Sequence, residues 1–282
     1  MAYALPITKM LLLFLVLQAC STEGNKLNEP ANDSSSQTRL TITGSSTLAP
    51  MVAEMAKLFE KSHPNIRVDV QTGGSSRGIA DVKQVSADLG MVSRRLYAEE
   101  TQIVPYLIAR DGVTMIVHQK NPLSDISQQQ IRDIYLSKSP HWPDNVLPGK
   151  NITRISKAEG RSTLEVFLGF LGVKNSQIQA DIIIGDNEQA VKLVAGNPLA
   201  IAYVSTSTAE YDVQLGIPIK ALSIDSIQPS QQNIAQGVFP LNRELNLISN
   251  HHPTPLAQRF IEFAQSDAVK PIIAEFRFVP AS

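Results

Sequence analysis

Residues 39–50 read Arg-Leu-Thr-Ile-Thr-Gly-Ser-Ser-Thr-Leu-Ala-Pro, and this stretch decides the fold. Residues 39–43 alternate apolar and polar side chains, which predicts a β-strand, and the apolar spacing after residue 48 predicts a helix over residues 49–62. Between them lies the turn Gly44-Ser45-Ser46-Thr47. A turn of this kind presents unpaired backbone N–H groups, hydroxyl donors and the positive end of a helix dipole at one point. It is therefore suited to holding a small anion.

Two further turns have the same construction. Gly73-Gly74-Ser75-Ser76-Arg77-Gly78 follows an alternating stretch over residues 66–71, and Gly160-Arg161-Ser162-Thr163 precedes an apolar stretch. We expect helices over residues 78–85 and 162–171. Ser and Thr are also the commonest helix N-caps, so any one of these turns is explained by capping alone. Three together favour one anion site to which all three contribute.

Length and charge limit the class of protein. The chain has 282 residues, 43% of them hydrophobic, and a formal net charge of −1. This length is enough for two modest domains with cores of their own. A near-neutral chain has no field that would attract nucleic acid, so no nucleic-acid partner is expected. The stretches 39–43, 66–71 and 87–92 are predicted strands that alternate with helices, which indicates a parallel sheet that binds ligands beyond the carboxyl ends of its strands. Further strands are predicted over residues 113–118, 152–155 and 200–204.

The N-terminus has the pattern of an exported protein. An apolar run over residues 10–17 follows Lys9, and it ends in Leu17-Gln18-Ala19-Cys20, which resembles a bacterial lipobox. We expect residues 1–19 to be a signal peptide, Cys20 to be lipidated, and residues 20–38 to be a flexible tether. A plain signal peptide with an incidental cysteine remains the alternative. Cys20 is the only cysteine, so no disulfide forms within the chain.

From residue 39 onward the sequence resembles the periplasmic phosphate-binding protein family of ABC transporters, within the type II solute-binding fold. The resemblance lies in residues 43–50, 73–79, 87–94, 109–113, 130–135 with Trp142, 200–204 and 239–243. It implies an α/β fold of the type II periplasmic binding protein class, with two lobes joined by a hinge and the ligand cleft between them. We expect lobe 1 at residues 39–116 plus 206–282, and lobe 2 at residues 117–205.

The resemblance also implies which residues bind the ligand. The first turn would contribute Ser46, Thr47 and the backbone N–H of Leu48, and the second Ser75 and Ser76. The third turn, from the other lobe, would close over the anion with Arg161, Ser162 and Thr163. Two departures from the family pattern stand out: Ser93 and Arg94 follow the strand where many members have an aspartate, and Arg161 replaces a serine. The expected ligand set is Ser46, Thr47, Leu48, Ser75, Ser76, Ser93, Arg94, Arg161, Ser162 and Thr163, with Lys157 in support.

The missing aspartate bears on selectivity. In the family, that carboxylate accepts the proton of monohydrogen phosphate and repels fully ionised sulfate. With Ser93 in its place, the choice between phosphate and another oxyanion stays open. Arg161 also has an alternative role, which is a salt bridge to Glu159 or to Glu165, four residues further along the predicted helix.

Enzymatic chemistry has little support. No Gly-x-Ser-x-Gly elbow or P-loop is present, and the only histidine pair, His251-His252, lacks a third ligand at metal spacing. We expect no catalytic activity, no metal and no cofactor.

The predicted function is capture of inorganic phosphate, or a related tetrahedral oxyanion, on the periplasmic side. The partners would be an inner-membrane ABC permease and, through the lipid anchor, the membrane, with the protein acting as a monomer. The alternative is a phosphate-sensing, envelope or adhesion lipoprotein of the same fold.

Overall fold

The computed structural model describes residues 37–281, whose apolar side chains gather into two main regions. The first lobe packs on the core that contains Leu40, Met55 and Phe260. Its elements come from both ends of this part of the chain: β1 (Thr38–Gly44), α1 (Ala49–Ser62), β2 (Ile66–Thr72), α2 (Ser75–Lys83), β3 (Leu89–Val92), β11 (Asn242–Ser249), α8 (Pro255–Ala264), η2 (Asp267–Val269), α9 (Lys270–Glu275) and β12 (Val279–Pro280).

The second lobe packs on the cores around Phe167 and Val191. Its elements are consecutive in the chain: β5 (Asp125–Ile126), α3 (Gln128–Tyr135), β6 (Thr153–Lys157), α4 (Ser162–Leu171), η1 (Asn175–Gln177), β7 (Ile182–Ile184), α5 (Asn187–Gly196), β8 (Ala200–Ser205), α6 (Thr206–Gln214), β9 (Ile219–Ala221), β10 (Ser223–Ile224) and α7 (Gln231–Ala235). One long strand, β4 (Val104–His118), belongs to both lobes, since Ile108 packs in the first core and Val113 in the second.

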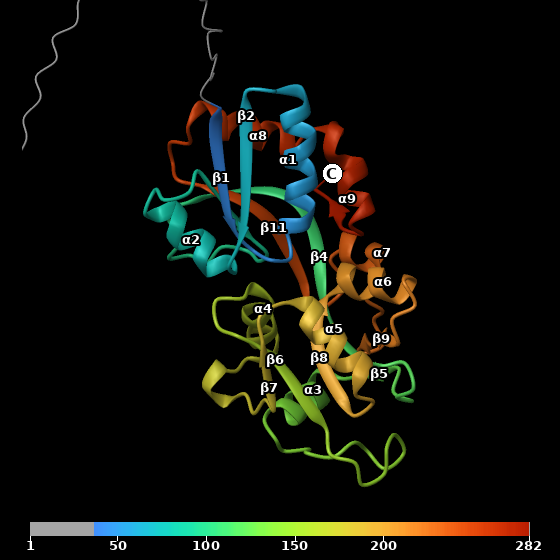
Figure 1. The fold of residues 1–282 in the computed structure, drawn as a ribbon. Coiled ribbons are helices and arrows are strands. Elements are labelled where there is room, and N and C mark those ends of the chain that lie inside the picture. Colours follow the sequence, from blue (N-terminus) through green and yellow to red (C-terminus); the bar gives the residue numbers. More distant parts are fainter. Residues whose placement is uncertain (1–36, 282) are drawn as a thin grey trace, which may run out of the picture. The chain divides into compact units, whose positions relative to one another are not determined.

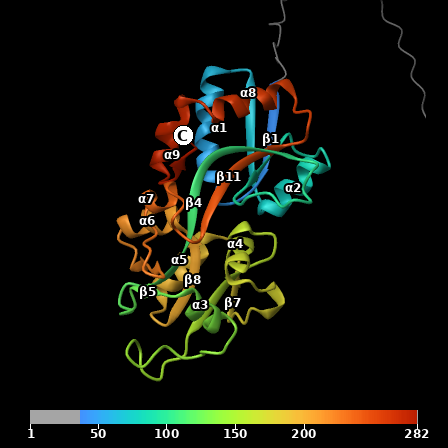
Figure 2. The same ribbon diagram turned by 180° about the vertical axis from the view of Figure 1, so that it is seen from behind.

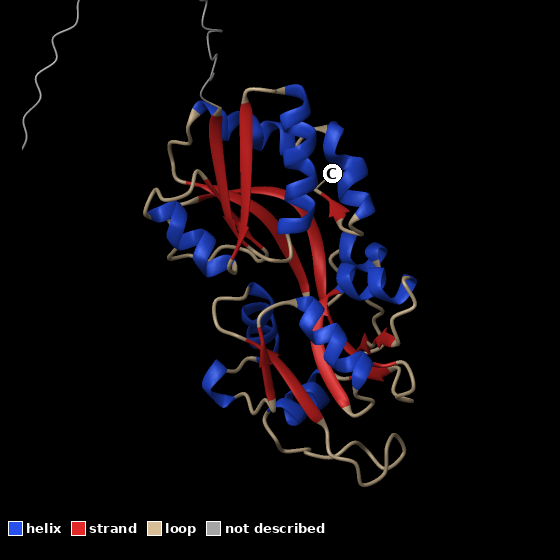
Figure 3. Cartoon of the chain, viewed as in Figure 1, coloured by secondary structure: helices blue, strands red, loops and turns tan. Residues whose placement is uncertain are grey.

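The sheet has the mixed pairing expected for this arrangement. In the described residues its strand order is β2-β1-β3-β11-β4-β8-β6-β7. β1 pairs in parallel with β2 and β3, and β6 pairs in parallel with β7 and β8, whereas β4 and β11 are antiparallel. Figures 1 and 2 show β4 and β11 running from one lobe toward the other. Figure 3 shows helices flanking the strands in both lobes.

Helix α1 illustrates how the sequence builds the first lobe. Pro50 occupies the first turn, where its missing N–H costs nothing, and Met51, Val52, Met55 and Phe59 form the fully buried face. Burying each such side chain contributes roughly 1.5–3 kcal/mol. The carboxyl ends of β1 and β2 thereby lie next to the N-termini of α1 and α2, which is the position that ligand-binding turns occupy in parallel sheets.

The chain returns to the first lobe later than we expected. The predicted boundary was residue 206, but Ala209 and Ile219 pack in a second-lobe core, as do Phe239 and Leu241. Ala209 lies on α6 and Ile219 on β9, which pack against β4, and Phe239 and Leu241 lie in the turn that leads into β11. The packing therefore indicates that the chain re-enters the first lobe along β11.

Several element boundaries also differ from the predictions. Helix α2 begins at Ser75 rather than at residue 78, because Gly74 serves as its N-cap. β4 begins at Val104, where no strand was expected, and residues 125–126 form a short strand before a Ser127-capped helix. The polar helices α6 and α7 had no apolar stripe by which to predict them.

The predicted signal peptide, Cys20 and nearly all of the tether lie outside the described residues. Among residues 37–281, no helix is both long and apolar enough to span a bilayer.

Candidate anion-binding site between the lobes

The three predicted turns meet at one small cavity. It measures about 10 Å³, roughly the space that one water occupies, and beside it the two lobes are joined by a hydrogen bond between Ser76 and Gly160. Four strand–turn–helix units supply its walls: β1 to α1, β2 to α2, β6 to α4, and β7 to α5. The lining residues are Ser45, Ser46, Thr47, Gly74, Ser75, Ser93, Lys157, Arg161, Ser162, Thr163, Gly185, Asp186 and Asn187.

A glycine lets the two lobes touch beside this cavity. Gly74 has φ +97°, a conformation that other residues rarely adopt, and a Cβ there would lie 2.6 Å from the carbonyl oxygen of Gly160. That carbonyl accepts a hydrogen bond of 3.2 Å from the backbone N–H of Ser76. Any side chain at position 74 would hold the second and third turns apart.

Hydroxyl groups of the first lobe are oriented by a short chain of hydrogen bonds. The Oγ of Ser45 accepts from the backbone N–H groups of Thr47 (3.2 Å) and Leu48 (3.4 Å), so its own proton goes to the Oγ of Ser93 at 3.0 Å. The N–H of Ser93 in turn donates to the Oγ of Ser75 at 3.3 Å. Because Ser93 and Ser75 accept in these bonds, their hydroxyl protons are available to a ligand.

The second lobe presents donors in the same way. α4 begins at Ser162, and its N-cap residue, Arg161, gives no side-chain hydrogen bond to the first turn. The Oγ1 of Thr163 accepts from the Arg243 guanidinium at 3.0 Å, which leaves the Thr163 proton free. Ser162 is only 2% exposed, and its Oγ has no partner within residues 37–281. A buried hydroxyl without a partner is costly, and a bound anion would satisfy it.

Two cations line the cavity. Lys157 is 3% exposed and its Nζ donates to the backbone carbonyl of Asp186 at 2.6 Å. Burial lowers the pKa of Lys157 to about 7, although the nearby Asp186 carboxylate opposes the shift. The half-buried Arg161 guanidinium forms no hydrogen bond or ion pair with any part of the chain that the structure describes. Both groups can therefore turn their charge to an anion.

A buried ion pair supports the site from behind. Arg243 on β11 and Asp111 on β4 are almost completely buried, and the Nη2 of Arg243 lies 2.7 Å from the Oδ2 of Asp111. The Ser205 hydroxyl donates to the same oxygen at 2.7 Å. Because Arg243 also donates to Thr163, the strands that cross between the lobes fix the start of α4.

Most of the predicted ligand residues lie where the turns meet. The cavity wall includes Ser46, Thr47, Ser75, Ser93, Arg161, Ser162 and Thr163. Leu48 and Ser76 are not part of that wall. The Leu48 side chain is buried in the first core with its N–H bonded to Ser45, and the Ser76 hydroxyl donates to Glu165 at 3.3 Å.

Arg94 differs most from its expected place. Its Nε donates to Glu165 on α4 at 2.5 Å, and its two Nη groups donate to Glu100 at 2.8 Å. The guanidinium also stacks 3.9 Å from the centre of the Tyr97 ring, and only 4% of Arg94 is exposed. Arg94 thus joins the two lobes outside the cavity, since two carboxylates already occupy its donors.

Sequence reasoning missed part of the wall. Gly185, Asp186 and Asn187 form a fourth turn, in which Asp186 caps α5 by accepting from the N–H of Gln189 at 2.9 Å. The signal was present as a Gly-Asp-Asn turn between an extended stretch and a helix. Lys157 was expected only in support, because nothing local shows that a lysine after a strand will be buried.

Comparisons with known proteins agree with this geometry. The model of the PBP superfamily domain matches residues 30–268. The phosphate-binding protein PstS of Bacillus subtilis is 25% identical, with 95% of this chain and 90% of that protein covered. PstS of Staphylococcus saprophyticus is 26% identical, with 84% and 76% covered.

Solved structures show the same fold. A candidate phosphate ABC transporter substrate-binding protein from Clostridium perfringens, solved with bound phosphate, superposes with a TM-score of 0.80 at 26% identity, covering 87% of this chain and all of the other. An ABC-type phosphate transport receptor from Vibrio cholerae gives 0.69 at 24% identity, covering 85% and 99%. The fold is that of a type II periplasmic binding protein, and the chain belongs to the PBP superfamily domain family.

Proposed function

We propose that this protein binds inorganic phosphate between its lobes and delivers it to an ABC permease. The observation that carries the proposal is the convergence of free hydroxyl protons, the uncapped start of α4 and two cations on one closed cavity. A tetrahedral oxyanion offers acceptors in every direction, so it matches walls that supply donors from both lobes.

The relatives support phosphate as the anion, because they are named phosphate-binding proteins and one structure holds phosphate. On this proposal Ser46, Thr47, Ser75, Ser93, Arg161, Ser162 and Thr163 contact the ligand. Leu48, Ser76 and Arg94 act through their neighbours. The cavity of about 10 Å³ is smaller than a phosphate ion, so the walls would move apart to hold the anion. Wider opening of the lobes about β4 and β11 would admit and release it, as in hinge-bending binding proteins.

Export and anchoring belong to the same proposal. A signal peptide at residues 1–19, lipid on Cys20 and a tether to residue 38 would hold a monomeric receptor at the outer face of the membrane that carries the permease. Mass spectrometry of the membrane-extracted protein would detect the acylated Cys20, and a Cys20→Ala variant should be released into the soluble fraction.

Isothermal titration with phosphate, sulfate, arsenate and molybdate tests the binding itself. We expect saturable, one-to-one binding of phosphate, with arsenate close behind because its size and proton content are similar. Failure of all four anions to bind would overturn the proposal. Phosphate uptake that is unchanged after deletion of the gene would contradict the transport role but not the binding.

A further inference from the structure

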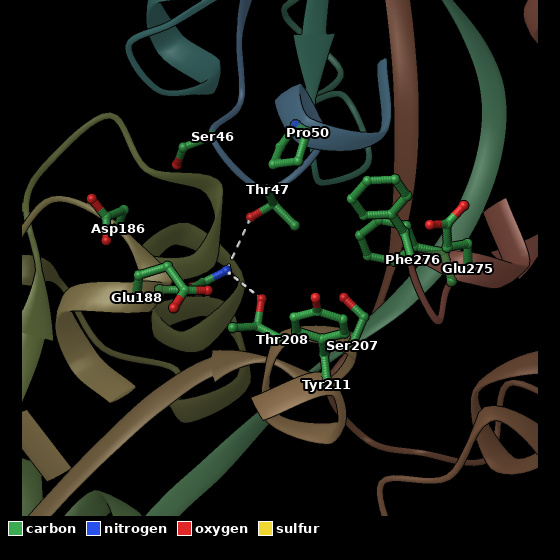
Figure 4. Close-up of a pocket in the computed structure, with 12 residues that line it drawn as sticks. Ser46, Thr47, Pro50, Asp186, Glu188, Ser207, Thr208, Tyr211, Glu275 and Phe276 are labelled. Atoms are coloured by element: carbon green, nitrogen blue, oxygen red, sulfur yellow. Dashed lines mark hydrogen bonds between the residues drawn. The ribbon is translucent and has the colours of Figure 1, made fainter. Parts of the chain in front are cut away.

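A second, larger cavity adjoins the anion cavity. It measures about 280 Å³ and shares Ser46, Thr47, Asp186 and Asn187 with the smaller one (Figure 4). The rest of its wall comes from α5 and α6 in the second lobe, and from α1, the end of α9 and the residues just after α9 in the first. The volume is too small for a drug-sized molecule and suits an organic group of a few heavy atoms.

The charge of this second cavity is opposite to that of the first. Asp186, Glu188 and Glu275 line it, and no Lys, Arg or His does. The carboxylates repel one another: burial and the neighbouring carboxylates of Asp212 and Asp186 raise the pKa of Glu188. A cationic group would relieve this repulsion, whereas a second anion would add to it.

Aromatic rings complete the wall. Tyr211, Phe276 and Phe278 line the cavity, and Figure 4 shows Phe276 on the side away from Asp186. Ring faces attract ammonium groups, and they do so most strongly where water is partly excluded. Carboxylates and aromatic rings in one wall form a surface suited to an alkylammonium group.

Asn187 lies between the two cavities. Its Nδ2 donates to the Oγ1 of Thr47 at 3.5 Å and to the Oγ1 of Thr208 at 3.3 Å (Figure 4). Both bonds are longer than the usual 2.9–3.0 Å, so displacing this side chain costs little. A ligand bound through an anion in the small cavity thus has a route for a substituent into the larger one.

We propose that the protein also accepts phosphate monoesters or phosphonates that carry an alkylammonium group. The phosphoryl end would occupy the cavity with Arg161 and Lys157, and the ammonium would lie in the second cavity, which Glu188, Tyr211 and Phe276 line. The anionic half of this inference rests on the proposed function, while the cationic half rests on the second cavity alone.

Titration calorimetry on the purified protein tests the inference with inorganic phosphate, phosphocholine, phosphoethanolamine and glycerol phosphate. We expect phosphocholine and phosphoethanolamine to compete with phosphate and to bind at least tenfold more tightly than glycerol phosphate, whose substituent is neutral. Glu188→Gln should reduce that preference three- to tenfold and leave the affinity for inorganic phosphate within twofold. Glu262→Gln, at an exposed carboxylate of α8 outside both cavities, is the matched control.

A second variant separates charge from shape. Phe276→Leu keeps an apolar side chain against the first core but removes the ring, and should weaken phosphocholine binding at least threefold. Phosphate binding without binding of either ammonium ligand would overturn the inference and leave the proposed function standing. An unchanged preference in Glu188→Gln would overturn it as well. If the wild-type protein binds no anion at all, the proposed function itself fails.

Discussion

At the scale of single residues, the candidate site depends on whether each hydroxyl group can still donate a hydrogen bond after its bonds within the protein are counted. Ser75, Ser93 and Thr163 are all acceptors in bonds within the protein, so each keeps its proton for a ligand. Among residues 37–281 the Ser162 hydroxyl has no hydrogen-bond partner, so it can still both donate and accept. The anion site is therefore built from ordinary hydroxyl groups that can still donate hydrogen bonds. Such a site disfavours cations and neutral molecules with few acceptor atoms.

Ser162→Ala should change stability and binding in opposite directions. Removal of a buried hydroxyl without a partner relieves a desolvation cost of about 1–3 kcal/mol, so the midpoint of thermal unfolding without ligand should rise. Phosphate affinity should fall, because one donor is lost. Differential scanning calorimetry and titration on the same preparations measure both. A fall in both quantities would show that Ser162 has a protein partner after all.

Lys157 predicts proton uptake on binding. With a pKa lowered to about 7, the amine is largely neutral at pH 8, and a bound dianion restores the proton by favouring the charged form. The enthalpy of phosphate binding at pH 8 should therefore depend on the ionisation enthalpy of the buffer, with uptake approaching one proton. The Lys157→Met variant should lose this dependence, whereas Lys192→Met, at an exposed position of α5, should keep it.

The same lysine affects folding stability with a definite sign. Its folded pKa lies below the unfolded value of 10.5, so between about pH 7 and pH 10 the unfolded chain binds more protons than the folded one. The contribution of Lys157 to the free energy of unfolding therefore rises with pH across that window. Below pH 7 the charged amine remains a cost to the folded state.

Asp186 is the carboxylate in the wall of the anion cavity, and we expect it to affect the choice between phosphate and sulfate. It lies in the second lobe, whereas the family resemblance implied an aspartate in the first lobe, at the position of Ser93. A carboxylate can accept a proton from monohydrogen phosphate but repels sulfate, which has none to give. Asparagine is also a good helix N-cap, so Asp186→Asn should leave α5 intact. The ratio of phosphate affinity to sulfate affinity should fall about tenfold or more. Titration with both anions checks this, and an unchanged ratio would assign selectivity elsewhere.

At the scale of elements, α4 both contacts the first lobe and lines the anion cavity. Its Glu165 accepts hydrogen bonds from Arg94 and Ser76, both of the first lobe, while Ser162 and Thr163 at its start face the cavity. An ion pair outside the small cavity therefore joins the two lobes. On the proposed function, Arg94 and Glu165 would be positioning residues that affect the ligand only through the closed state.

Glu165→Gln should accelerate ligand release. Loss of a partly buried ion pair costs about 1 kcal/mol, which corresponds to a roughly fivefold faster dissociation of phosphate if the pair forms only on closure. Rapid-mixing chase experiments measure the dissociation rate. Glu159→Gln, at an exposed carboxylate just before α4, should leave it unchanged. A slower association with unchanged dissociation would argue that the pair already exists in the open form.

What the sequence could predict at this scale depends on how local the cause is. The turns after β1 and β6 and the bounds of α1 and α4 follow from glycine, hydroxyl and apolar spacing within a few residues, and the structure confirms them. The first half of β4 was missed because Arg110 and Asp111 interrupt its apolar pattern. Asp111 can be buried because distant residues, Arg243 and Ser205, bind its carboxylate. Lys157 and Asp186 were missed as wall residues because distant segments enclose them.

At the scale of the whole molecule, the described chain is held together where β4 and β11 cross between the lobes. Asp111 and Arg243 lie on these strands and are 1% and 0% exposed at their side chains. A buried pair of this kind adds little net stability over an apolar pair, yet removal of one partner leaves an uncompensated charge. The crossing is thus sensitive to any single change in charge.

Asp111→Asn should lower the free energy of unfolding by about 3–5 kcal/mol, because Arg243 stays buried without its counter-ion. Urea denaturation followed by circular dichroism measures the loss. Glu54→Gln, which breaks an exposed pair with Lys57, should cost less than about 1 kcal/mol. Equal effects of the two substitutions would mean that the interior reorganises around Arg243.

The first core has a consequence for biosynthesis. It combines residues near the start of the described chain, such as Leu40 and Met55, with Phe260 and Phe278 near its end. A nascent chain cannot complete this core until almost all of it has left the ribosome, since folding needs the last helices to cover the first strands. If the protein is exported as proposed, this delay would keep the polypeptide unfolded, which is the state that a translocation channel accepts. The discontinuous layout of the lobe would then favour export over premature folding in the cytoplasm.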